Sequence, residues 1–314
     1  MNFENPFPAG LFCDRRLANV ETWHLIPPAD FNMLLPDITR KSVVYLGIEI
    51  SDGGFRKISY RGTGFLMAFP ADKISGAWFG YLVTAKHVAI QFKEKDFYIR
   101  ANTIDGKSID INAPKEVQWH FHPTDSAADV AICRFEPPPR TIDALGIPAD
   151  AILKEHVRKS KGFGVTDSVF ITGLFVYHQG NKKNIPIIRV GNIAMTPDER
   201  IQTSWGEMEA YLIEARSIGG LSGSPVFLIE DLPSGDMRIH LLGLIHGHWN
   251  VAPEIITDNV AEDAGIKAGI NVGIAIVTPA EKILDVLNCA ELVSWREKAQ
   301  LHRLSKNLPT PDNI

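Results

Sequence analysis

Hydrophobic and polar residues alternate along much of this chain with the two-residue period of a β-strand. Val43, Val44, Leu46, Ile48 and Ile50 form a run that ends at Ser-Asp-Gly-Gly, residues 51–54, which predicts a strand followed by a hairpin turn. Further short strands are expected at 64–68, 80–84, 97–100, 117–121 and 130–135, and then at 168–172, 185–190, 210–215, 225–229, 239–245 and 272–277. Many short strands at this spacing favour an all-β barrel or sandwich.

Breaks in this pattern divide the chain. Three prolines at 137–139 cannot continue a strand ladder and favour an extended connection. After Pro279 the apolar residues recur at helical spacing, which predicts a C-terminal helix beginning at Thr278-Pro279. The predicted organisation is an N-terminal arm at 1–40, a first β-region at 41–136, a linker at 137–164, a second β-region at 165–278, and a C-terminal helix and tail at 279–314.

Composition and charge narrow the class of protein. The 314 residues are 45% hydrophobic and 22% charged, enough apolar material for a sizeable core. A net charge of −5 without a basic stripe argues against nucleic acid as partner, and the sequence has no run of 18 apolar residues that would indicate a membrane partner. The N-terminus shows no secretory signal, and three widely spaced cysteines are an odd count, so reduced thiols and a cytoplasmic location are expected.

Three separate segments carry residues suited to nucleophilic catalysis. Residues 219–225, Gly-Gly-Leu-Ser-Gly-Ser-Pro, present Ser222 among glycines whose backbone N–H groups can converge on one concavity. Residues 82–88 run from a strand into a short turn that presents His87, and Asp129 begins an apolar strand. Each segment alone also fits a purely structural role.

Their order along the chain strengthens the interpretation. His87, Asp129 and Ser222 follow one another in one of the orders known for a Ser-His-Asp triad. The proline-rich linker falls between the aspartate and the serine, so each β-region would supply part of a site in the cleft between them.

These segments resemble the chymotrypsin-like (trypsin-fold) serine peptidases, especially bacterial members of the HtrA-type and glutamyl endopeptidase groups. The resemblance covers about residues 42–290 and rests on 62–65 (Gly-Thr-Gly-Phe), 84–88 (Thr-Ala-Lys-His-Val), 129–131, 221–226 (Leu-Ser-Gly-Ser-Pro-Val), 243–245 and 273–277. It implies two antiparallel β-barrels with the catalytic groove between them.

The resemblance also implies a role for each residue. Ser222 would be the nucleophile of an endopeptidase that acts on a protein or peptide by acyl transfer without a cofactor. His87 would be its general base, and Asp129 would orient the imidazole. The backbone N–H groups of Gly220 and Ser222 would form the oxyanion hole.

The expected wall of the specificity pocket is the strand that carries His246, Gly247 and His248, with Arg216 and Ser217 at its base. Since glutamyl endopeptidases use a histidine there, either histidine could bind an acidic side chain. Solvent-facing histidines are the alternative. A preference for cleavage after Glu or Asp is therefore a hypothesis, and Arg216 would support it.

Other interpretations remain open. The fold could serve as a catalytically silent peptide-binding or regulatory module, or residues 1–40 could hold a peptidase inactive. Two histidine pairs, at 120 and 122 and at 246 and 248, could each face one side of a strand, but a zinc site needs three or four ligands and no third cluster is visible, so no metal is expected. Cys133 lies in a predicted strand and is expected to be buried and structural.

Overall fold

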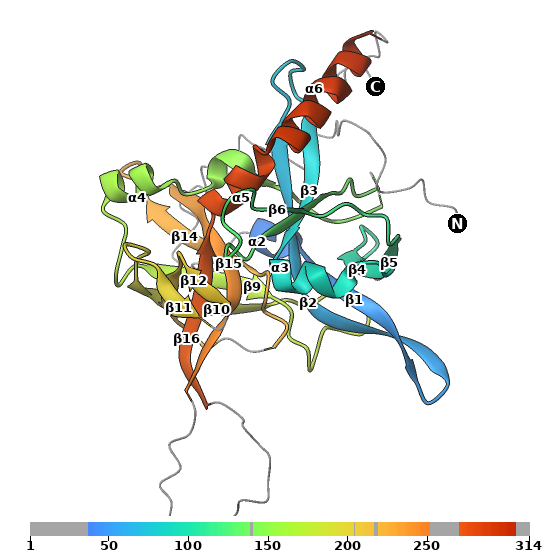
Figure 1. Ribbon diagram of the computed structural model, residues 1–314, viewed down its shortest axis with the longest axis horizontal. Coiled ribbons are helices and arrows are strands. Elements are labelled where there is room, and N and C mark those ends of the chain that lie inside the picture. The colour runs from blue at the N-terminus through green and yellow to red at the C-terminus, as the bar shows by residue number, and fades with distance from the viewer. Residues whose placement is uncertain (1–36, 139–140, 204, 217–218, 252–269, 306–314) are drawn as a thin grey trace, which may run out of the picture.

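The computed structural model describes residues 37–138, 141–203, 205–216, 219–251 and 270–305. Its strands form one eight-stranded sheet, one closed barrel and one separate two-stranded sheet, with two helices at the C-terminal end (Figure 1). The expected all-β class, with a closed barrel and C-terminal helices, is confirmed. The exact domain boundaries, including the arm at 1–40, stay predictions, since residues 1–36 lie outside the described part.

The N-terminal sheet has the strand order β5-β4-β1-β2-β3-β7-β6, and β8 pairs in parallel with β2. Among the described residues, β5 and β6 are the edge strands of this sheet and do not pair with each other, so strand pairing does not close the sheet into a barrel. Its strands are β1 (Val43–Asp52), β2 (Phe55–Pro70), β3 (Trp78–Thr84), β4 (Phe97–Asn102), β5 (Ser108–Ala113), β6 (His120–Phe121), β7 (Ala131–Arg134) and β8 (Ile147–Pro148).

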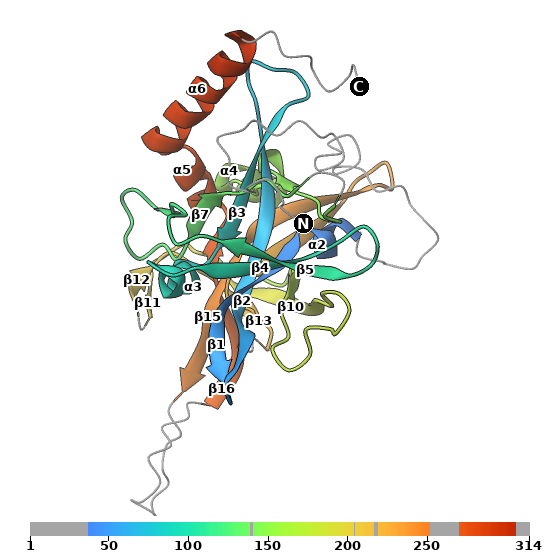
Figure 2. The same cartoon turned by 90° about the vertical axis from the view of Figure 1, so that its right-hand side faces the viewer.

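The β1–β2 hairpin extends away from the body of the fold (Figures 1 and 2). Asp52 pairs with Phe55 across the turn, as the sequence predicts. Gly53 and Gly54 both have positive φ, +57° and +86°, the backbone that a two-residue turn of this kind requires.

The C-terminal β-region is a closed barrel of antiparallel strands in the order β10-β13-β16-β15-β14-β9. A separate two-stranded hairpin, β11 and β12, leaves it between β10 and β13. The strands are β9 (Ser168–Gly173), β10 (Ile187–Met195), β11 (Ile201–Thr203), β12 (Gly206–Met208), β13 (Tyr211–Glu214), β14 (Pro225–Asp231), β15 (Met237–Val251) and β16 (Ile270–Pro279).

One hydrophobic core joins the two β-regions. Along β14, Val226 and Leu228 point into the barrel, whereas Phe227 between them belongs to the core of the N-terminal sheet. This division follows from the alternation of side chains along a strand. Ile239 and Leu241 of β15 join Phe227 in the larger core, so the outer face of the barrel is the packing surface for the first sheet.

Helices are short except at the C-terminal end. The expected helix start at Thr278-Pro279 is displaced, because β16 continues through Pro279 and the first helix begins at Glu281. The predicted strand at 117–121 is also shorter, and only His120–Phe121 pair. The helices are α2 (Asp37–Lys41), α3 (Lys86–Ala89), α4 (Glu155–Lys161), α5 (Glu281–Leu287) and α6 (Ala290–Ser305), with 3₁₀ turns η1 (Ile90–Phe92) and η2 (Ala149–Ala151).

Helix α6 is fixed to the N-terminal sheet by a buried arginine. Arg296 donates hydrogen bonds to the Leu287 carbonyl at 2.7 Å and to the Tyr81 hydroxyl at 3.1 Å. Its guanidinium also lies 4.1 Å from the centre of the Phe69 ring. The cation is therefore held by oxygens and an aromatic face, which lets the helix cover the ends of β2 and β3.

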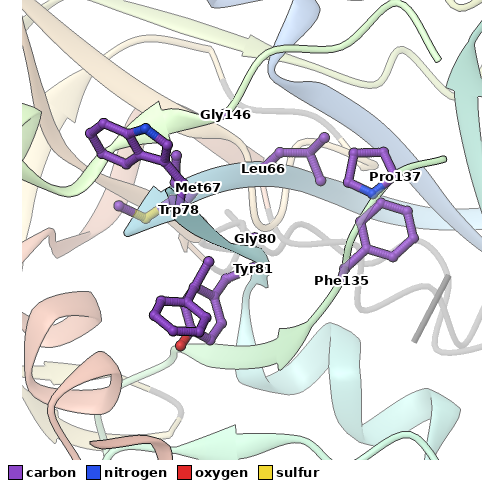
Figure 3. Close-up of a pocket in the computed structure, with 10 residues that line it drawn as sticks. Leu66, Met67, Trp78, Gly80, Tyr81, Phe135, Pro137 and Gly146 are labelled. Carbon is purple, nitrogen blue, oxygen red and sulfur yellow. The ribbon is translucent and has the colours of Figure 1, made fainter. Parts of the chain in front are cut away.

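A small apolar cavity lies between β2, β3 and the segment after β7 (Figure 3). Leu66, Met67, Tyr81 and Phe135 are among the side chains around it. Its volume is about 20 Å³, close to the room that one water needs. The cavity is a packing defect of the core rather than a ligand site.

Glu136 follows β7 in a largely apolar setting, and this gives a prediction about stability. Burial raises the pKa of Glu136 to about 8, against the opposing charge of Arg134. Between roughly pH 4.5 and 8, Glu136 is largely ionised in the unfolded chain but largely protonated in the folded protein. Glu136 therefore destabilises the folded protein increasingly as the pH rises through this range. We expect Glu136→Gln to raise the free energy of unfolding by roughly 1–3 kcal/mol at pH 8 and to change it little at pH 4.

Urea unfolding at the two pH values measures this difference. Glu214→Gln, at an exposed site on β13, serves as the matched control and should show no such pH-dependent gain. An equal effect of Glu136→Gln at both pH values would show that ionisation of Glu136 has no part in it.

Candidate active site

Strand pairing brings His87 and Asp129 together although 42 residues separate them. Strands β3 and β7 are antiparallel, with Thr84 opposite Ala131. His87 lies three residues after Thr84, on the short helix α3, and Asp129 lies two residues before Ala131. Both side chains therefore reach the same end of the sheet.

Asp129 contacts His87 at two points. The Asp129 Oδ2 atom lies 2.7 Å from His87 Nδ1, and Oδ1 accepts the His87 backbone N–H at 2.9 Å. The aspartate is 5% exposed, so these bonds are poorly screened by water. One carboxylate thus fixes both the ring and the main chain of the histidine.

A second imidazole, from His246 on β15, contacts the same carboxylate. Its Nδ1 lies 2.6 Å from Asp129 Oδ2, and the side chain is buried. Burial works against ionisation of Asp129, but the hydrogen bonds from His246 and His87 outweigh it and hold the pKa of this carboxyl well below its ordinary value. Asp129 is therefore an anion at neutral pH, and both imidazoles donate to it.

The loop that carries Ser222 is held against the N-terminal sheet by Thr63 of β2. The Thr63 hydroxyl donates to the Gly220 carbonyl at 2.7 Å and accepts the Leu174 N–H at 2.9 Å. The Thr63 N–H donates to the Ser222 carbonyl at 2.9 Å. Gly223 has φ of +82°, and a Cβ there would collide with the Thr63 carbonyl oxygen. The loop therefore requires glycine at 223 and a hydroxyl at 63.

The Ser222 hydroxyl donates to the backbone carbonyl of His246 at 3.3 Å. Among the hydrogen bonds of the described residues, none joins Ser222 to the His87 ring. Ser222 is thus linked to the His87–Asp129 pair through His246, which binds both Ser222 and Asp129.

Two backbone amides expected to form an oxyanion hole belong to this loop. Within the described part of the chain, the N–H groups of Gly220 and Ser222 donate to no other residue. Gly220 has φ of +94°, a backbone conformation that glycine adopts readily. Both backbone N–H groups therefore make no hydrogen bond to the described residues.

Trp205, at the turn between β11 and β12, is a member of the site that the sequence did not reveal. Its ring centre lies 5.7 Å from that of His87 and 6.2 Å from that of His246. The indole is 56% exposed, so it borders the two imidazoles while facing solvent. A tryptophan in a polar hairpin gave no periodic signal that would have placed it here.

The residues expected to line a specificity pocket differ from one another in burial and in their contacts. His246 is buried and its Nδ1 is bound to Asp129, and a role for this residue in binding a substrate side chain stays a prediction. Gly247 and His248 lie next on β15, and Arg216 is exposed. Ser217 lies outside the described residues. The hypothesis of a preference for acidic side chains stays a prediction.

The histidines at 120 and 122 bind the C-terminal helices. His120 Nδ1 lies 3.3 Å from Glu291, and His122 Nε2 lies 3.1 Å from Asp285. Each thus has a carboxylate partner on α5 or α6.

His87, Asp129 and His246 could in principle hold a metal, since their ligand atoms all lie within 4.8 Å of one another. Two ligands bound to one tetrahedral zinc at about 2.0–2.1 Å would lie roughly 3.3 Å apart. The observed contacts of 2.6 and 2.7 Å between Asp129 Oδ2 and the two nitrogens are hydrogen-bond lengths instead. The arrangement is that of a hydrogen-bonded cluster.

A polar hollow of about 710 Å³ opens beside Trp205. Charged side chains of both signs line it, including Asp125, Glu207, Arg200 and Lys282. Asp125 binds Arg200 at 3.1 Å and lies 3.7 Å from Lys282. The hollow is therefore polar and shares Trp205 with the surroundings of the His87 ring.

Two cysteines fall in the described part, and both are free thiols. Cys133 is fully buried on β7, as expected for a structural cysteine, and Cys289 is partly buried. The cytoplasmic location stays a prediction. No helix among the described residues is long and apolar enough to cross a membrane.

No family model and no curated protein matches the sequence. Among solved structures, the MamO protease domain from Magnetospirillum magneticum, in its apo form, is similar with a TM-score of 0.47 and 14% identity, over 80% of this chain and 97% of that one. Deg5 is similar with a TM-score of 0.42 and 19% identity, over 79% of this chain and 88% of that one.

Proposed function

We propose that this protein is a serine endopeptidase of the chymotrypsin-like type, with Ser222 as nucleophile, His87 as general base and Asp129 as the residue that orients the base. The single observation that carries the proposal is the double contact between Asp129 and His87. An ionised carboxylate that accepts the Nδ1 proton leaves Nε2 of the same ring unprotonated. His87 Nε2 is then the atom that can take a proton from a serine hydroxyl.

The reaction would be acyl transfer. His87 Nε2 takes the Ser222 proton as Oγ attacks the carbonyl carbon of the scissile peptide, and the carbonyl oxygen becomes an oxyanion facing the N–H groups of Gly220 and Ser222. The imidazolium then gives the proton to the leaving amine as the C–N bond breaks. Water repeats the sequence on the acyl-enzyme and releases the acid product and free Ser222.

The open Ser–His bond is compatible with this mechanism. Catalytic hydrogen bonds are often long or misaligned before substrate binds. In the proposed mechanism the Ser222 hydroxyl leaves the His246 carbonyl and turns to His87 Nε2 when substrate binds. The substrate would be a protein or peptide.

The hydrogen bond from Ser222 to the His246 carbonyl favours a second candidate, a catalytically silent peptide-binding or regulatory module. In such a protein the Ser222 hydroxyl would remain on that carbonyl, and the groove would bind a peptide without cleaving it. Reactivity of Ser222 distinguishes the two candidates.

We expect a fluorophosphonate probe to label the full-length protein at Ser222, as mapped by mass spectrometry of the adduct. The label should disappear in Ser222→Ala and fall strongly in His87→Ala, because the hydroxyl is a poor nucleophile without its base. Ser160→Ala, at an exposed serine on α4, is the matched control and should label like the wild type. A folded wild-type protein that takes no label at Ser222 would favour the binding module.

A further inference from the structure

Beyond the proposed triad, one buried side chain is bound to its central carboxylate without an assigned role. Asp129 Oδ2 has two imidazole partners, His87 at 2.7 Å and His246 at 2.6 Å. The two rings are nearly perpendicular, at 80°, with centres 5.6 Å apart. The carboxylate is therefore held from both sides, and the shorter of the two contacts comes from His246.

A bulge in β15 explains how His246 reaches Asp129. In the ladder with β16, Ile245 pairs with Val277 and Gly247 pairs with Ile276, so His246 between them is an extra residue without a partner opposite it. A bulge bends the strand and redirects the side chain of the extra residue, and bulges are frequent next to active sites. Here the redirected side chain leaves the barrel and binds a residue of the other sheet.

His246 contacts both ends of the proposed triad. Its imidazole binds the aspartate, and its backbone carbonyl accepts the Ser222 hydroxyl at 3.3 Å. A change in the position of this one residue would therefore alter the placement of the carboxylate and of the nucleophile together.

Hydrogen-bond capacity fixes the protonation state of the cluster. An ionised carboxylate only accepts, and Asp129 accepts three N–H groups, one at Oδ1 and two at Oδ2. Both imidazoles must then carry their proton on Nδ1. Without the His246 donor, Oδ2 would be buried with one partner fewer, and the carboxylate would be freer to rotate away from His87.

We infer that His246 is a positioning residue of the active site, which holds Asp129 in the orientation that keeps the Nδ1 proton on His87. This inference rests on the proposed peptidase function. Since the His246 ring is buried and bound to Asp129, its action is on the rate of the chemical step rather than on binding of substrate.

Two substitutions test the role. His246→Asn places an amide N–H near the position of Nδ1, so the donor is kept without an imidazole, whereas His246→Leu keeps much of the volume and removes the donor. We expect His246→Leu to lower kcat toward a quenched fluorescent peptide about 10–100-fold, the scale of a small misplacement of catalytic groups, with KM nearly unchanged. His246→Asn should recover most of that loss.

A second measurement does not depend on activity. In a Ser222→Ala background, proton and ¹⁵N NMR of the histidine side chains should show Nδ1–H signals shifted to low field for both His87 and His246. With His246→Leu added, the remaining His87 signal should broaden or move, and His246→Asn should restore it.

The outcomes are distinct from those of the peptidase proposal. Failure of fluorophosphonate labelling in the wild type removes the peptidase function, and the NMR result alone then decides whether His246 positions Asp129 and His87. Equal kcat values for wild type and His246→Leu, or an unchanged His87 signal in that variant, would overturn the inference. So would equal losses in the Leu and Asn variants with the fold intact, since the donor would then not matter.

Discussion

We expect replacement of Asp129 by asparagine to lower the rate constant of Ser222 acylation about 10⁴-fold, the scale found in the template Ser-His-Asp enzymes. The reason lies in three N–H groups that point at the carboxylate. An amide offers one acceptor oxygen and one NH₂ donor. In the first orientation of the introduced amide, its oxygen faces the two imidazoles and its NH₂ group faces the His87 backbone N–H. In the second orientation the amide is turned round, and the NH₂ group faces Nδ1 of His87 and of His246.

The second orientation is the damaging one for catalysis. It favours an Nδ1 that accepts and an Nε2 that carries the proton, and an Nε2–H cannot take the proton of Ser222. In the first orientation the NH₂ opposes the His87 backbone N–H, which cannot change from donor to acceptor. Neither orientation of the introduced amide therefore satisfies all three donors, whereas the carboxylate accepts from each of them.

The rate of fluorophosphonate inactivation measures this effect without knowledge of the natural substrate. Asp143→Asn is the matched control: Asp143 binds Lys41 at 2.8 Å through a partly exposed side chain, and the variant should react like the wild type. An Asp129→Asn protein that is folded by circular dichroism and reacts at more than a tenth of the wild-type rate would contradict an orienting role for Asp129.

Much of the site was open to prediction because its parts lie in short segments with distinctive residue types. A histidine after a small-residue turn and a serine among glycines each indicate a particular local backbone conformation. The alternation of apolar and polar residues indicates the strands that carry these segments. The contact between His87 and Asp129 then follows from the antiparallel pairing of β3 with β7, a long-range pairing that the alternation of residues does not specify.

The role of His246 was not accessible in the same way. Strand alternation alone assigns each residue of 243–248 to one face or the other, and a bulge changes that assignment by one position. The resemblance to glutamyl endopeptidases suggested a place for His246 or His248 at the pocket wall, and it gave no sign that the extra residue in β15 turns Nδ1 of His246 toward Asp129. Nothing in the order of residues around 246 marks the bulge, which depends on pairing with β16.

The C-terminal end shows a similar limit. The helical period after Pro279 was visible, but proline tolerates the end of a strand as well as the first turn of a helix. The ladder with β15 decides the matter, since Gly243 pairs with Pro279. Long-range pairing, rather than local preference, sets the boundary.

Thr63 joins the loop that carries Ser222 to the N-terminal sheet. We expect Thr63→Val to lower the free energy of unfolding by about 2–5 kcal/mol, because it leaves two buried backbone groups, the Gly220 carbonyl and the Leu174 N–H, without their partner. Valine matches the shape of threonine, so the loss comes from the hydroxyl. The same change removes the hydrogen bond that fixes the Gly220 carbonyl, so the backbone on either side of Gly220 is less ordered, and we expect the rate of Ser222 acylation to fall at least about 10-fold through loss of order in the proposed oxyanion hole.

Thr63→Ser separates hydrogen bonding from packing. It keeps the hydroxyl that serves Gly220 and Leu174 and removes one methyl group, at a cost of about 1 kcal/mol, so its acylation rate should stay near that of the wild type. Urea unfolding gives the stability of both variants, and fluorophosphonate kinetics give the reactivity of Ser222. If the valine and serine variants were equally stable and equally reactive, the Thr63 hydroxyl would not be the group that holds the Ser222 loop in place against the N-terminal sheet.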